Sequence, residues 1–301
     1  MSIKLIDKNH DIISSKEYTT CHLAAKILGN YPDSKEGTVH LITAEKVLTM
    51  SFFSKLDDLF DDFHTVNVKL FVFDSTTDST FAPDGPCFII SGTEDMNRFQ
   101  KVFGENGIHI SKLANPDEVN LAYQRHFGTE SNMKSLGLGE LKADLSIAET
   151  SIRNAEAVFL DLSAIQKQDS FFEKSSILGL NIFESCQLLK TAALSDKNKL
   201  VFINTEDLDL NSNTEELISL LFWYYLEGYK NRKIEDLENP DHLVYLVDSE
   251  FYDQPIKFIK GNITGRWWFV HPEIHEPIAC HLKDYEQLKA GKIPDIFMSL
   301  I

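Results

Sequence analysis

Ala157-Val158-Phe159-Leu160-Asp161-Leu162-Ser163-Ala164-Ile165 is an apolar run that ends on a carboxylate and a small polar residue. The run is short and bounded by polar residues, which is typical of a buried strand. In an open α/β sheet, ligand-binding groups collect at the carboxyl ends of the strands. The run therefore predicts a central strand that places Asp161 where a metal ligand or a catalytic acid would lie.

The amino-acid composition and net charge argue against some classes of partner and site: nucleic acids, anionic membranes and C-x-x-C metal sites are not expected. The 301 residues are 43% hydrophobic and include 29 Lys plus Arg against 46 Asp plus Glu, a net charge of −17. Nucleic acids and anionic membranes are polyanions, so neither is expected as a partner, and the dispersed acids favour a role in solubility. The four cysteines form no C-x-x-C pair. No apolar signal region follows Met1, so we expect a soluble cytoplasmic protein.

Strand and helix patterns alternate along the chain. This alternation predicts a three-layer αβα sandwich with a mostly parallel central sheet, in a single domain over residues 1–301. The expected strands are 38–43, 66–73, 87–90, 108–110, 119–123, 157–165 and 199–204, and the expected helices are 20–28, 52–63, 96–103, 147–155, 180–193 and 213–229. The helix expected at 213–229 is apolar nearly all round, which indicates a buried helix, and we expect Leu217 to Tyr225 to be largely buried.

From about residue 118 onward the chain resembles the ureohydrolase superfamily of arginases, agmatinases and, most closely, bacterial formimidoylglutamase-like proteins. The resemblance rests on the central strand and on the matching segments 119–124, 193–197, 223–224, 228–233 and 266–268. Residues 1–117 are divergent and shortened, and there it rests on Ile89-Ile90-Ser91-Gly92-Thr93-Glu94-Asp95, which is similar to the family's Gly-Gly-x-His turn. The resemblance implies the same three-layer fold.

The resemblance also implies a metal-dependent chemistry, but this chain lacks most of the residues that the chemistry requires. Family members hold two Mn²⁺ ions that share a hydroxide, which attacks a guanidinium or formimidoyl carbon. Here Glu94 stands where the family has a metal-binding His, Asp161 fits the first position of the central Asp-x-Asp, and Ser163 replaces the second. The family's Asp-x-His-x-Asp strand has no counterpart between Phe103 and Val119, and Ile203 stands where a glutamate binds the substrate cation.

These residues can also have a purely structural role, in which they bind no metal or substrate. Asp161 can cap the following loop through backbone N–H groups, and Glu94 and Asp95 suit a helix N-terminus. His271 and His275 have helical spacing for a metal site, but Pro272 follows His271 and no third ligand is evident.

Trp267 and Trp268 suit either an exposed partner patch or, as we favour, burial in the fold or in an oligomer seam.

Two functions follow from the sequence. The first is a pseudoenzyme, a ureohydrolase-fold protein without metals or other cofactors that serves as a binding, regulatory or structural module. The second is a metal-dependent C–N hydrolase of formimidoyl or guanidino compounds, which would use Mn²⁺. The missing Asp-x-His-x-Asp strand favours the first. We also expect a homo-oligomer, with Trp267, Trp268 and Phe269 suited to self-contact, and an unidentified protein or small-molecule ligand.

Overall fold

The computed structural model describes residues 136–298, except 156, 167–177, 199, 205–211, 239–240, 251 and 273–274, together with the backbone of the strands that precede residue 136. Contacts divide the chain into two compact units, Met1–Asn231 and Arg232–Ile301. The single domain expected over residues 1–301 stays a prediction, and each unit is described by itself below.

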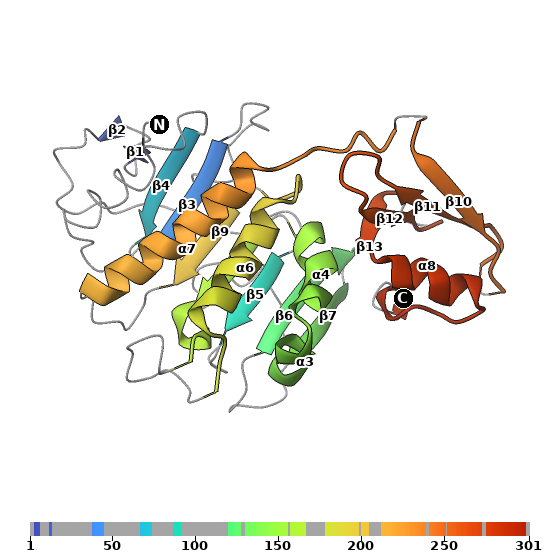
Figure 1. The fold of residues 1–301 in the computed structure, drawn as a ribbon, viewed down its shortest axis with the longest axis horizontal. Helices are drawn as coiled ribbons and strands as arrows, with labels where there is room; N and C mark the ends of the chain where they lie inside the picture. Colours follow the sequence, from blue (N-terminus) through green and yellow to red (C-terminus); the bar gives the residue numbers. More distant parts are fainter. Residues whose placement is uncertain are drawn as a thin grey trace. The chain divides into compact units, whose positions relative to one another are not determined.

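The first unit is built on a nine-stranded sheet in the order β2-β1-β4-β3-β9-β8-β5-β6-β7 (Figure 1). The pairs from β1 through β4, β3, β9 and β8 to β5 are parallel, whereas β2, β6 and β7 pair antiparallel. The strands are β1 (Ile3–Ile6), β2 (Ile12–Ile13), β3 (Thr38–Ala44), β4 (Asn67–Phe73), β5 (Cys87–Ser91), β6 (Asn120–Phe127), β7 (Glu130–Gly137), β8 (Ala157–Asp161) and β9 (Leu200–Asn204). This sheet is mostly parallel, and the unit has an α/β fold.

The strand that contains Asp161 lies inside the sheet, as the sequence predicted. β8 pairs in parallel with β5 on one side and with β9 on the other. In this register Leu160 pairs with Ile203, and Asp161 pairs with Asn204. An edge position for β8 would have contradicted the prediction, so the central placement of Asp161 is confirmed.

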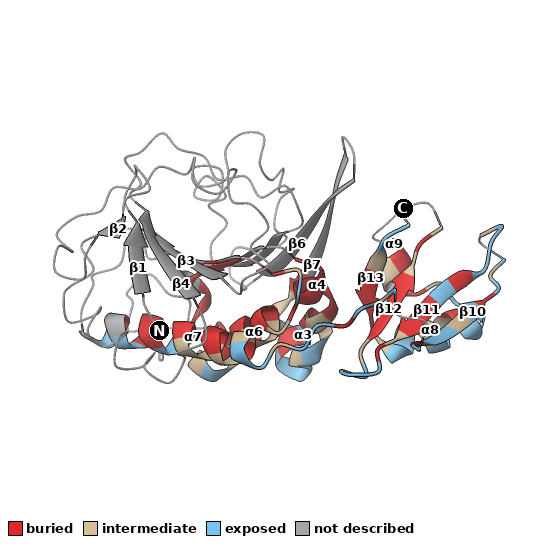
Figure 2. Cartoon of the chain, turned by 90° about the horizontal axis from the view of Figure 1, so that it is seen from above, coloured by how far each residue is buried: buried red, intermediate tan, exposed pale blue. Residues whose placement is uncertain are grey.

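The described helices of this unit cover one face of the sheet (Figures 1 and 2). They are α3 (Leu138–Ala143), α4 (Glu149–Asn154), α6 (Ile182–Ala193) and α7 (Ser212–Lys230), with the short 3-10 helices η3 (Leu145–Ala148) and η4 (Leu162–Ala164). The helices expected at 20–28, 52–63 and 96–103, and the strand expected at 108–110, lie outside the described residues. The second helix layer of a three-layer sandwich therefore stays a prediction.

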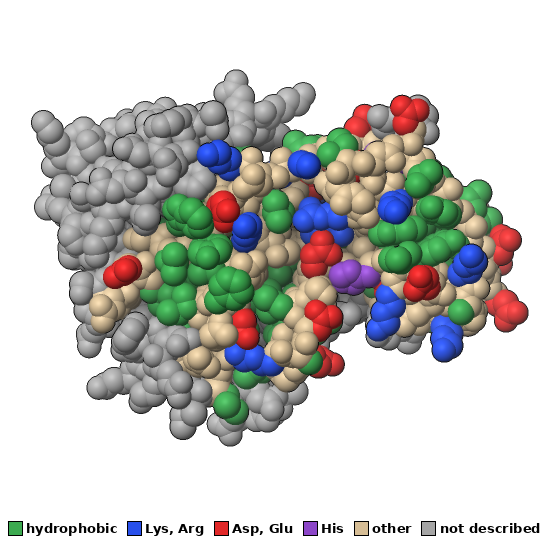
Figure 3. Space-filling model, in the orientation of Figure 1, with side chains coloured by type: hydrophobic (Ala, Val, Ile, Leu, Met, Phe, Trp, Pro, Cys, Tyr) green, Lys and Arg blue, Asp and Glu red, His purple; other side chains and the backbone are tan. Residues whose placement is uncertain are grey.

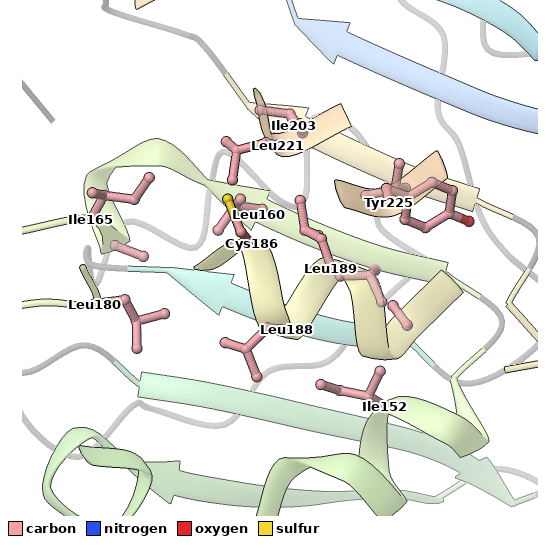
Figure 4. Close-up of a cluster of buried hydrophobic side chains, with 14 of the residues drawn as sticks. Ile152, Leu160, Ile165, Leu180, Cys186, Leu188, Leu189, Ile203, Leu221 and Tyr225 are labelled. Carbon is pink, nitrogen blue, oxygen red and sulfur yellow. The ribbon is translucent and has the colours of Figure 1, made fainter. Parts of the chain in front are cut away.

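The core between this helix layer and the sheet is apolar (Figure 4). Leu189 of α6 and Tyr225 of α7 are fully buried, as the helical spacing of their apolar neighbours predicted. The segment from Leu217 to Leu226 is largely buried, although Leu220 is 37% exposed. Gly228 lets α6 and α7 approach closely, because a Cβ there would lie 2.5 Å from the carbonyl oxygen of Lys190.

The second unit is an antiparallel sheet that the sequence did not predict. Its strands β10 (Leu243–Val247), β11 (Ile256–Lys260), β12 (Trp267–Val270) and β13 (Pro277–Cys280) pair in chain order. Helices α8 (Leu282–Lys289) and α9 (Asp295–Met298) follow, and Leu288 and Phe297 pack against Phe258 and Phe269 of the sheet. Figure 3 shows hydrophobic side chains gathered on one face of this unit, with Lys or Arg side chains beside them.

The two tryptophans of β12 are buried, which was the favoured alternative. Trp267 is 9% exposed, Trp268 is 8% exposed, and the next residue, Phe269, is fully buried. Trp267 packs with the residues on the helix-covered face of the sheet, whereas Trp268 packs with Ile259 on the other face. Adjacent aromatic residues in a strand thus contribute one ring to each face. No helix among the described residues is long and apolar enough to cross a membrane.

Candidate functional site

The carboxyl end of β8 is the candidate site. Asp161 is the last residue of β8 and is 3% exposed. Alternation along the strand directs it away from the core cluster that contains Leu160. The chain then turns through η4, and backbone position 163 lies two residues after this carboxylate.

A tight backbone crossing closes the segment that follows the site. The N–H of Gln166 donates to the carbonyl of Leu180 at 2.8 Å, and the N–H of Leu180 donates to the carbonyl of Ala164 at 2.9 Å. A Cβ at Gly179 would lie 2.7 Å from the carbonyl oxygen of Ala164, so only glycine fits. This crossing pins residues 164–166 against residues 179–180 and fixes the backbone just beyond Asp161.

Ile203, the residue expected at the family's substrate position, is not the register partner of Asp161. Ile203 is fully buried and belongs to the core cluster between the sheet and helices α6 and α7 (Figure 4). It pairs with Leu160, whereas the β9 residue that pairs with Asp161 is Asn204. The assignment of Ile203 to the family's substrate position stays a prediction. Asn204 is the β9 residue in register with Asp161, and a strand-end register is not visible in sequence.

The other predicted ligand positions lie largely outside the described residues. Glu94 and Asp95 lie outside the described residues, and so does the side chain of Ser163. Among the described residues, no three His, Cys, Asp or Glu side chains come together in a group that could hold a metal ion. Burial raises the pKa of the Cys186 thiol to about 12, so this cysteine is a neutral packing group in the core.

The acids at the start of α6 have a structural role. Asn181 Oδ1 accepts from the N–H of Glu184 at 2.8 Å, and Glu184 Oε2 accepts from the N–H of Asn181 at 2.8 Å. This reciprocal pair is a capping box. Lys142 Nζ also lies 2.5 Å from Glu184 Oε2. The only acid in the first turn of α6 is thus committed to the helix end.

His271 and His275 do not lie on a helix. The N–H of His275 donates to the carbonyl of His271 at 3.0 Å across a tight turn, and His275 has a φ of 60°. His271 is 3% exposed, and its Nε2 lies 3.3 Å from the hydroxyl of Tyr252. The helical spacing that suggested a shared metal does not apply, because neither residue belongs to a helix and His275 has a positive φ.

The second unit contains a buried polar cluster that sequence reasoning missed. The Glu235 side chain is 2% exposed, and its Oε1 accepts from the N–H of Ile263 at 2.9 Å, the N–H of Thr264 at 2.5 Å and the Thr264 hydroxyl at 2.9 Å. Its Oε2 lies 4.0 Å from His242 Nε2 and has no hydrogen-bond partner among the described residues. The residue precedes its hydrogen-bond donors by almost thirty positions, so no local pattern identifies it.

The electrostatics of this cluster favour an ionised carboxylate. Burial alone would raise the pKa of Glu235, but the N–H and hydroxyl of Thr264, the N–H of Ile263 and the nearby His242 together lower it. A Cβ at Gly261 would overlap the carboxylate, so a glycine is needed there. Glu235 thus holds the segment before β10 against the β11–β12 turn.

Comparison with known proteins gives weak fold similarities. No protein family model and no curated protein sequence matches the chain. Among solved structures, it is similar to arginase from Bacillus cereus (17% identity, TM-score 0.26, 30% of this chain and 34% of that one). It is also similar to a Mn²⁺-containing formiminoglutamase from Trypanosoma cruzi (9% identity, TM-score 0.39, 67% of this chain and 96% of that one). A third similar structure is agmatine ureohydrolase of Thermoplasma volcanium (10% identity, TM-score 0.39, 69% of this chain and 98% of that one). Because these TM-scores lie below 0.5, the function is argued from the residues.

Proposed function

We propose that this chain is a non-catalytic protein of the ureohydrolase fold, a cytoplasmic pseudoenzyme that acts as a binding, regulatory or structural module. The order of its ureohydrolase-like segments supports this fold, and so does the central, parallel position of β8. In this proposal the helices that cover one face of the sheet are matched by a second layer on the other face, which completes a three-layer αβα sandwich.

The observation that carries the proposal is the set of side chains available at the end of β8. Two divalent cations repel each other at short range, and only several converging carboxylates offset that repulsion. Here Asp161 is the one carboxylate on β8, its register partner is the amide residue Asn204, and Ser163 brings a neutral hydroxyl. Ile203 is apolar and belongs to the core. This set does not fit a pair of Mn²⁺ ions.

The consequence for chemistry is large. Water has a pKa of about 15.7 in bulk but about 7 on an activating metal ion. Without such activation, almost no hydroxide is available at neutral pH to attack an amidine carbon. We therefore expect no hydrolysis of arginine, agmatine or formimidoylglutamate at enzymatic rates.

One observation favours the alternative, a metal-dependent C–N hydrolase. Asp161 is kept at the strand end and is buried, as a ligand of a reduced Mn²⁺ site would be. In that case Glu94 would complete the remnant ligand set, and the substrate would be a formimidoyl or guanidino compound.

A non-catalytic module needs a partner. The net charge of −17 speaks against nucleic acid and anionic membrane. We propose an unidentified protein or small-molecule ligand and a homo-oligomeric chain.

The test is release of urea or formamide by the full chain with added Mn²⁺, for each of the three substrates. We expect no turnover, and we expect that Ser163→Asp does not create any, because one carboxylate replaces only one of the lost ligands. Asp161→Asn is the matched control. Turnover that a chelator and Asp161→Asn both abolish would establish the hydrolase instead.

A further inference from the structure

The outer strand of the second unit has an apolar, unprotected edge. β10 pairs with β11 and ends the four-stranded sheet. Three of its side chains are well exposed: Leu243 at 51%, Val244 at 48% and Leu246 at 69%. An outer strand presents a row of backbone N–H and C=O groups that another strand can pair with.

The two ends of this sheet differ in how they are protected. Proteins block edges with charged side chains, proline or a bulge. β13, at the far end, begins at Pro277, which has no N–H to offer, and its remaining residues are buried. β10 is Leu-Val-Tyr-Leu-Val and contains no charge, no proline and no glycine. Solubility alone would not select such an edge, which suggests that another strand covers it.

The sequence of β10 is suited to pairing with itself. We propose that β10 of one chain pairs antiparallel with β10 of a second copy, which joins the two sheets into one. A two-fold axis at Tyr245 sets the two copies of that residue opposite each other, Leu243 opposite Val247, and Val244 opposite Leu246. Every directly opposed pair is then apolar, and such pairs stabilise antiparallel strands.

Self-pairing also reduces the exposed apolar surface. Val244 and Leu246 lie on the same face of the sheet, because they alternate with Tyr245. The two-fold axis therefore brings two copies of each into one cluster beside Ile259, which is already buried on that face. A random encounter of two chains of net charge −17 would be repulsive, whereas this register opposes no charges.

The proposed interface consists of a single short strand, β10, from each chain. Contacts of this size belong to the weak, transient class, so we expect a dissociation constant in the micromolar range. Since the chains repel each other through their net charge, added salt should strengthen the dimer. This inference concerns assembly and does not depend on whether the chain is catalytic.

The first experiment is analytical ultracentrifugation of the full chain from about 1 to 100 μM, a range chosen around micromolar affinity. We expect a monomer–dimer equilibrium. Leu246→Lys should weaken it at least about tenfold, because it replaces the apolar contact with the opposed Val244 of the second copy by a charge. Ile263→Lys is the matched control: Ile263 is 57% exposed and lies in the β11–β12 turn, away from the edge. It should dimerise like the wild type.

A second experiment tests the register without relying on the lysine variants. Val244→Cys and Leu246→Cys chains should form a disulfide when mixed under mild oxidation, because these positions oppose each other across the axis within the reach of a disulfide. Each variant alone should cross-link far less. A wild-type chain that stays monomeric throughout the range would overturn the proposal. So would a dimer that Leu246→Lys leaves intact, or mixed cysteine chains that cross-link no more than the single variants.

Discussion

Glu235 is a buried carboxylate that hydrogen bonds hold in place. Its buried Oε1 accepts three hydrogen bonds from Ile263 and Thr264. Hydrogen bonds to a charged group contribute about 1.5–3 kcal/mol to stability. We expect Glu235→Gln to lower the free energy of unfolding by about 2 kcal/mol in urea titrations. Glu238→Gln is the control, because Glu238 is exposed on the same segment. Equal stability of the two variants would contradict this role.

The same residue predicts a pH dependence. The pKa of Glu235 in the folded chain is lowered, whereas in the unfolded chain it takes the ordinary value of about 4.3. The unfolded chain therefore binds the proton first, so the stabilisation is complete above that pH and is lost as the pH falls through the folded-state value. The difference in unfolding free energy between wild type and Glu235→Gln should shrink on acidification below about pH 4.3. A difference that grows there would show the opposite sign.

Sequence reasoning at the residue scale found Asp161 and missed Glu235. Asp161 follows directly from a local pattern, since a carboxylate that ends a buried strand is visible in five residues. Glu235 depends on a turn nearly thirty residues later, and such a contact leaves no local pattern. Asn204 was missed for a similar reason, because the register of β8 against β9 is set by packing of the whole sheet.

At the scale of elements, the contact between α6 and α7 depends on one glycine. A Cβ at Gly228 would lie 2.5 Å from the Lys190 carbonyl oxygen and 2.9 Å from the Ala193 Cβ. Gly228→Ala should push the helices apart and cost about 1–3 kcal/mol, despite the higher helix propensity of alanine.

Gly139→Ala is the matched control for this helix contact. Gly139 lies in α3 with open space at its Cβ, so the same change should stabilise the chain by about 0.4–1 kcal/mol. Thermal and urea unfolding of both variants would measure the opposite signs. Two variants that shift stability in the same direction would refute the close-packing argument.

Many elements of the first unit followed from the hydrophobic pattern, whereas β1, β2, β7 and α3 of that unit and the sheet of the second unit did not. Strands β3, β4, β5, β8 and β9 and helices α6 and α7 lie within a few residues of their expected bounds. β7 was missed because Ser131, Asn132, Lys134 and Ser135 hide its alternation. The sheet of β10 to β13 was missed because no helix separates its four strands. The alternation of strands and helices that marked the first unit is therefore absent there.

At the scale of the whole molecule, the chain combines a mostly parallel sheet with a separate antiparallel one. Each of these units has its own hydrophobic cluster. The proposed absence of catalysis belongs to the first unit, and the proposed self-pairing belongs to the second. These two proposals can therefore fail independently. A measurement of metal binding tests only the first proposal, because it concerns only the end of β8.

The most direct test of the pseudoenzyme proposal is the amount of manganese that the full chain retains. The purified protein would be loaded with excess Mn²⁺, passed through a desalting column and analysed for metal by mass spectrometry. We expect well below two equivalents of tightly held Mn²⁺ per chain, because Asp161 and a neutral serine cannot offset the repulsion between two divalent cations. Two equivalents of tightly held Mn²⁺ per chain, lost on Asp161→Asn, would contradict it.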